Sequence, residues 1–97
     1  MSSISKHEFL KQKALNFRTL LLSYEPDAEV QNMLSGFNEM MLIPTIHTVL
    51  LPLKASGKLE ATVAQVMTKL KVPEAEKATV QSKILRYFEL FIEVSST

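Results

Sequence analysis

Apolar residues in the first part of the chain recur at alternating steps of four and three residues. This spacing matches the turn of an α-helix and stacks the side chains on one helix face. The residues are Leu10, Ala14, Phe17, Leu21 and Tyr24. Ser5 stands where an N-cap is expected, and Glu8, three residues later, completes a capping box. The pattern predicts a helix over about residues 6–23.

Prolines and a glycine divide the rest of the chain into further helices. Pro26 and Pro73 suit the first turn of a helix, and Gly57 after Ser56 is typical of a helix end. The predicted helices cover roughly residues 26–43, 44–55, 58–71 and 73–94. We therefore expect an all-α fold, a small four- to five-helix bundle that forms a single domain over residues 1–97.

Two segments have readings that differ from this simple pattern. Residues 45–55 are rich in β-branched side chains and would also suit a strand, but a lone strand has no partner elsewhere in the sequence. We predict a short helix that begins at Pro44 and is disturbed at Pro52, with a proline-kinked continuation of the preceding helix as the alternative. Gly36 lies inside the predicted helix 26–43, where it would allow another helix to approach closely.

The charge balance and composition exclude several classes of protein. The formal net charge is +1, so no overall field attracts nucleic acid or an anionic membrane. Cysteine is absent, which excludes disulfides and thiolate metal sites. The N-terminus lacks the apolar core of a secretory signal, and the longest uncharged stretch, Met40 to Leu53, is too short to span a membrane. We expect a cytoplasmic or nuclear protein, or a viral or phage protein in the host cytoplasm.

No residue pattern indicates catalysis. The two histidines, His7 and His47, have no carboxylate or second histidine four residues away, so neither a catalytic pair nor a metal site is expected. Ser56-Gly57-Lys58 lacks the earlier glycine and the following Ser or Thr of a phosphate-binding loop. We predict a protein that is not an enzyme and has no cofactor, metal or small-molecule substrate.

The last predicted helix carries two apolar rows. One row is Val80, Ile84, Tyr87, Phe91 and Val94, and the second is Leu85, Phe88 and Ile92. Together they cover about half of the helix circumference, which is more than a surface helix needs. We expect the first row to face the core and the second to form a homodimer interface. The alternative is a central helix that its own chain covers on both sides.

Methionines provide a second candidate interface. Met40 and Met41 stand beside the uncharged stretch, where flexible thioether side chains would suit an adaptable binding groove. Filling of gaps in the core is the alternative. The sequence thus predicts a non-enzymatic helical protein-protein interaction module that acts as an adaptor or regulator and binds itself, an unidentified protein, or both.

A small helix-turn-helix-like DNA-binding regulator is the alternative function. Residues 62–86 would form the motif, and Lys77, Lys83 and Arg86 would contact the nucleic acid. Glu74 and Glu76 at the start of the recognition helix would oppose phosphates, so we expect nucleic-acid binding to be absent or weak. A plain helical hairpin explains the same pattern.

Overall fold

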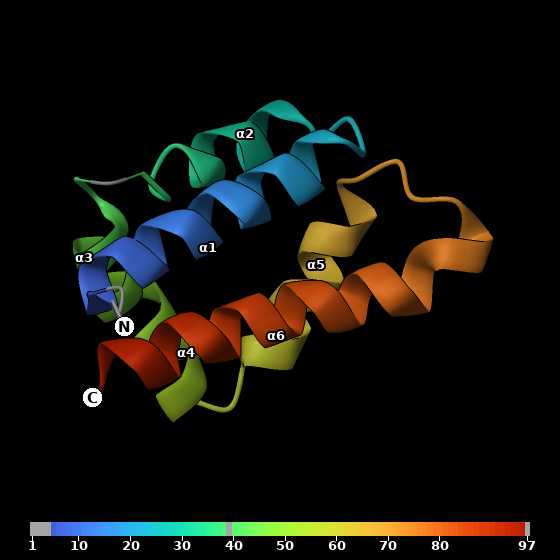
Figure 1. Ribbon diagram of the computed structural model, residues 1–97. Helices are drawn as coiled ribbons and strands as arrows, with labels where there is room; N and C mark the ends of the chain where they lie inside the picture. Colours follow the sequence, from blue (N-terminus) through green and yellow to red (C-terminus); the bar gives the residue numbers. More distant parts are fainter. Residues whose placement is uncertain (1–4, 39, 97) are drawn as a thin grey trace.

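The computed structural model describes residues 5–38 and 40–96, and its fold is all-α, which confirms the predicted fold class. Figure 1 shows the helices gathered into one compact body. The elements are α1 (Lys6–Leu22), α2 (Ala28–Leu34), α3 (Leu42–Thr45), η1 (Ile46–Leu50), α4 (Leu51–Ala55), α5 (Leu59–Thr68), η2 (Glu74–Glu76) and α6 (Lys77–Ser95). No helix within these described ranges is long and apolar enough to cross a lipid bilayer.

Helix α1 forms as its sequence predicts. The Ser5 hydroxyl oxygen accepts a hydrogen bond from the Glu8 backbone N–H at 3.1 Å, which caps the first turn. The apolar row at steps of four and three is buried along the helix, and Tyr24 at its end lies just beyond the last turn. The N-terminal cap and the core face of α1 were therefore both readable from local sequence.

The predicted helix over residues 26–43 is wrong in its second half, because α2 ends at Leu34. A turn follows in which the Asn38 side-chain oxygen accepts hydrogen bonds from the backbone N–H groups of Met40 and Met41, at 2.9 and 2.8 Å. Asparagine competes with the helix in this way because its short side chain can replace the backbone acceptor. The chain then forms a new helix, α3.

Residues 42–55 form one continuous helical run with a wide turn, η1, in its middle. The Leu51 N–H donates to the Ile46 carbonyl five residues earlier, which is the π-helical pattern. Pro52 follows directly and has no N–H for the Thr48 carbonyl, so the regular ladder is interrupted at this point. The segment is thus helical, as predicted, and disturbed next to Pro52. It begins two residues before Pro44.

Helix α4 ends at a glycine, as predicted from Ser56-Gly57. Gly57 has φ +73°, and the N–H of Lys58 donates to the Leu53 carbonyl at 2.9 Å, which is the pattern of a Schellman motif. Helix α5 ends at Thr68, earlier than the predicted residue 71, and α6 follows the 3-10 turn η2.

The loop after α1 is joined to the loop after α5, and we call this contact the loop junction. The Lys71 N–H donates to the Tyr24 carbonyl at 2.8 Å, and the Asp27 N–H donates to the Lys69 carbonyl at 3.2 Å. The Lys69 ammonium also lies 2.7 Å from a carboxylate oxygen of Glu29. Lys69, directly after α5, therefore balances negative charge at the start of α2.

The loop junction should make folding sensitive to alkaline pH. The hydrogen bond from the Tyr24 hydroxyl to Glu76 raises the pKa of Tyr24 above 10.0, and the hydrogen bond to Glu29 raises the pKa of Lys69 above 10.5. Between the unfolded-state and folded-state pKa values of the two groups, the folded chain holds more protons than the unfolded chain. The stability that the two hydrogen bonds contribute is therefore complete below the unfolded-state pKa values, and it is lost as the pH rises through the folded-state pKa values.

We therefore expect the temperature at the midpoint of thermal unfolding to decrease as the pH is raised from about 9.5 to 11.5. In the double variant Tyr24→Phe, Lys69→Met the fall should be shallower, because these two titrations are removed. Circular dichroism melting curves at a series of pH values measure this difference. Equal pH slopes for the two proteins would contradict the prediction.

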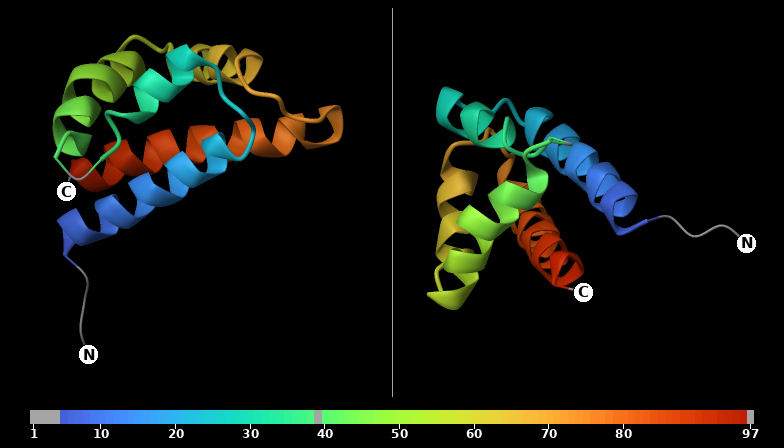
Figure 2. Two further views of the ribbon diagram at one scale, coloured as in Figure 1. Left: turned by 90° about the horizontal axis from the view of Figure 1, so that it is seen from above. Right: turned by 90° about the vertical axis from the view of Figure 1, so that its left-hand side faces the viewer.

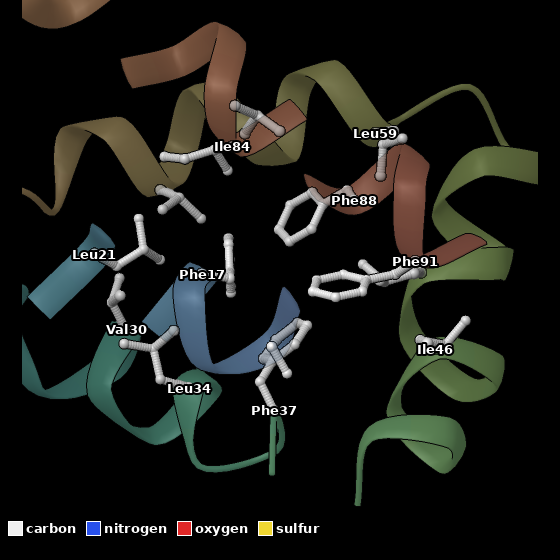
Figure 3. Packing of buried hydrophobic residues seen from close by; sticks show 14 of the residues in the cluster. Phe17, Leu21, Val30, Leu34, Phe37, Ile46, Leu59, Ile84, Phe88 and Phe91 are labelled. Atoms are coloured by element: carbon white, nitrogen blue, oxygen red, sulfur yellow. The ribbon is translucent and has the colours of Figure 1, made fainter. Parts of the chain in front are cut away.

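Helix α6 lies at the centre of the molecule. It contacts α1 on one side and η1 and α5 on the other. Figure 2 shows α6 running beside α1, with the α3–α5 segments on its opposite flank. The aromatic rings of α1 and α6 meet between these layers (Figure 3). Two sides of α6 therefore pack against other helices of the chain, and a narrower outer face remains exposed.

Candidate protein-interaction site

The structure places two of the predicted interface residues in the interior. Phe88 is 1% exposed and Ile92 is 2% exposed, and Leu85 is partly buried against the same cluster. The prediction that this second apolar row forms a homodimer interface is therefore wrong for Phe88 and Ile92. The physical reason is the central position of α6, whose second apolar row is covered by the chain itself.

The predicted methionines, in contrast, lie on the surface. Met40 is 86% exposed and Met41 is 49% exposed, so they do not fill gaps in the core. Val49, on η1, is 46% exposed. Large apolar side chains at this exposure retain their ability to bind apolar groups, because their surface remains in contact with water.

A hollow without charged residues lies beside Val49, and we call it the neutral hollow. It measures about 230 Å³ and is lined by α2, the turn after α2, the α3–α4 run, α5 and α6. Its lining residues are Asn32, Met33, Ser35, Gly36, Phe37, Thr45, Val49, Leu50, Leu53, Thr62 and Phe88. None of these carries an ionisable side chain. The nearly complete burial of Phe37, Leu50 and Phe88 makes them its floor.

Gly36 sets the distance between two walls of the neutral hollow. A Cβ atom at Gly36 would lie 2.9 Å from the Thr45 hydroxyl oxygen, which is closer than atoms normally approach. The same hydroxyl donates a hydrogen bond to the Gly36 carbonyl at 3.0 Å. The glycine therefore permits a close approach, as the sequence suggested, although it does so in a turn rather than within a helix.

Met41 belongs to the same helical row as two lining residues. It precedes Thr45 by four residues, and Val49 follows Thr45 by another four, so the three residues follow one side of the helical run. The turn held by Asn38 places Met40 and Met41 at the start of this row. Of the three exposed apolar residues, Val49 lines the neutral hollow itself, and Met40 and Met41 precede the helical run that carries Val49.

The residues predicted for nucleic-acid contact do not form a helix-turn-helix arrangement. Eight residues separate the end of α5 at Thr68 from the start of α6 at Lys77, whereas that motif uses a turn of three or four. Lys77 lies 2.9 Å from Glu74 in a salt bridge. Lys83 and Arg86 lie in the first half and middle of α6, away from its leading end.

The described residues contain no group of three or more acidic or histidine side chains arranged to hold a metal ion. His7 and His47 are both exposed. Val49 and Thr62 line the hollow without having been indicated by the sequence, because their position there depends on how η1 and α5 meet. Met40 and Met41 were indicated by their position beside an uncharged stretch.

Comparisons with protein-family models, with curated proteins and with solved structures found no match to this chain.

Proposed function

We propose that this protein is a non-enzymatic protein-interaction module that binds an uncharged, apolar segment of a protein partner at the neutral hollow. The observation that carries the proposal is a hollow with no ionisable lining residue, bordered by exposed Val49, with exposed Met40 and Met41 just before the same helical run. An adaptor or regulatory role would follow from such binding.

The chemistry of the surface favours an apolar occupant. An ionised side chain placed in the neutral hollow would lose its hydration without gaining a charged partner, which is costly. A leucine, methionine or phenylalanine side chain would instead remove apolar surface from water on both sides. Flexible methionines beside the hollow can repack around such a side chain.

The size of the hollow favours a protein segment over a small molecule. Its volume of about 230 Å³ is below the range of about 300–1,000 Å³ that is typical of ligand pockets. It has room for one anchoring side chain or two, with the rest of the partner lying across Met40 and Met41. Such an arrangement resembles the docking of one face of an amphipathic helix into a groove.

Site-specific photo-crosslinking tests this proposal. A photoreactive amino acid would replace Val49 in the tagged protein expressed in its source cell, and Gln65, exposed on α5, would be the matched control position. We expect a crosslinked protein at position 49 that is absent at position 65. Mass spectrometry would identify this partner.

Purified partner would then be titrated against the unmodified protein, Val49→Glu and the control Ala64→Glu. Val49→Glu should weaken binding by about 30-fold or more, as at an interface hot spot, because a charge enters an apolar contact. Ala64→Glu should change the affinity little. Equal affinities for all three proteins, or no crosslink specific to position 49, would overturn the proposal.

A further inference from the structure

The outer face of α6 carries charges whose sign reverses along the helix. Lys83 lies in the first half of α6 and Arg86 at its middle, and Glu89 and Glu93 lie in the second half. All four side chains are exposed. Within the described part of the chain, no salt bridge involves any of them. At about 100° per residue they share the side opposite the buried row.

This order of charges is complementary to itself when the helix direction is reversed. A two-fold axis that crosses α6 near residues 87 and 88 places Arg86 opposite Glu89 of a second copy, and Lys83 opposite Glu93. Because the interface of a two-fold dimer is isologous, each contact occurs twice. A parallel arrangement would place like charges together. We propose that the outer faces of two α6 helices pair in antiparallel orientation, so that the protein forms a homodimer.

Apolar surface is present where the axis would cross. Leu90 and Tyr87 are half-buried on this face, and Leu20 of α1 lies beside them. These residues border an open depression of about 940 Å³ along α6, where a second helix has room to pack, and Lys13 of α1 and Lys54 of α4 lie at its edge. Exposed ion pairs contribute little each, so the charges mainly fix orientation while the leucines and tyrosine supply contact area.

The same face is a poor match for nucleic acid. Glu89 and Glu93 continue the line that Lys83 and Arg86 begin, so a phosphate backbone would meet repulsion along half of its path. A second copy of this chain in antiparallel orientation places its acidic residues opposite the basic ones and its basic residues opposite the acidic ones. The charges of α6 itself, two of each sign, therefore favour self-association over a polyanion, and Lys13 and Lys54 border the same depression from α1 and α4.

This dimer is independent of the proposed function at the neutral hollow. Phe88 faces the hollow from the side of α6 opposite Arg86, since two residues correspond to about 200° of helix rotation. Both surfaces can be occupied in one molecule. Failure of either proposal leaves the other intact.

Sedimentation equilibrium of three charge variants tests the dimer. We expect the unmodified protein to self-associate with a dissociation constant of about 10–100 µM at low salt, and more weakly at 0.5 M salt because the charges are screened. Lys83→Glu with Arg86→Glu leaves four acidic side chains at these positions of α6, and Glu89→Lys with Glu93→Lys leaves four basic ones. Each double variant should be monomeric at 1 mM.

Mixing and full reversal give the decisive results. An equimolar mixture of the two double variants should form a heterodimer, because an acidic face then meets a basic one. The quadruple variant with all four charges reversed should dimerise again, since its order remains self-complementary. Circular dichroism would confirm that these surface changes leave the fold intact. A monomeric unmodified protein at 1 mM and low salt, or variants that associate regardless of charge, would overturn the proposal.

Discussion

Replacement of Phe17 with alanine should lower the free energy of unfolding by about 3–5 kcal/mol, which is a large part of the total for a small domain. The Phe17 ring is completely buried, and its centroid lies 4.9 Å from that of Phe37 and 5.4 Å from that of Phe88. Phe91 and Tyr87 complete the group at 5.9 and 5.6 Å. One truncation therefore removes contacts from α1, α6 and the turn after α2.

Urea denaturation followed by circular dichroism measures the change. Leu15→Ala is the matched control, because Leu15 lies on the same helix and is 55% exposed. Its truncation should change the free energy of unfolding by no more than about 0.5 kcal/mol. A loss below 1 kcal/mol for Phe17→Ala would show that its cavity collapses or that the ring is not central. If the dependence of the unfolding free energy on urea concentration has the same slope in both proteins, the two unfold between equivalent folded and unfolded states.

The features that the sequence predicted well are those fixed by residues close together in the chain. The cap at Ser5 and the glycine end of α4 each depend on groups within five residues of one another, and the core face of α1 depends on neighbours three or four residues apart. The apolar spacing predicted too long a helix after Leu34 and again after Thr68. Phe37 continues that spacing and is buried, but it reaches the core from a turn rather than from a helix.

The candidate site could be predicted only in part, because it depends on how distant segments meet. Met40 and Met41 were identified from the uncharged stretch beside them. Val49 lies in the wide turn η1, where Ile46 and Leu50 are buried and Val49 is 46% exposed. The walls of the neutral hollow come from α2, α5 and α6, whose meeting requires contacts across more than 50 residues.

The two apolar rows of α6 are a second feature whose surroundings depend on distant parts of the chain. Their breadth showed that the helix is covered on more than one side, but a periodic pattern is the same whether the cover comes from the chain itself or from a second copy. The structure supplies the cover within the chain, from α1, η1 and α5. The side of α6 that stays exposed carries Lys83, Arg86, Glu89 and Glu93 instead of the second apolar row.

Phe88→Glu should consequently prevent the domain from folding. Phe88 is 1% exposed and stacks on Phe37 with ring centroids 6.3 Å apart, in a region where the described residues provide no cationic side chain. A carboxylate there would be buried without a partner, and protonation to avoid this still leaves a polar group among aromatic rings. The expected cost reaches or exceeds the stability of a domain of this size.

Gln81→Glu is the control, because it adds the same charge at an exposed position of the same helix. Far-ultraviolet circular dichroism and a thermal melt of both variants give the comparison. We expect Gln81→Glu to melt cooperatively, and Phe88→Glu to lose the cooperative transition and bind a dye specific for exposed apolar surface. A folded, more soluble Phe88→Glu monomer would instead mean that Phe88 is covered by a second copy in solution, and the central position of α6 would have to be abandoned.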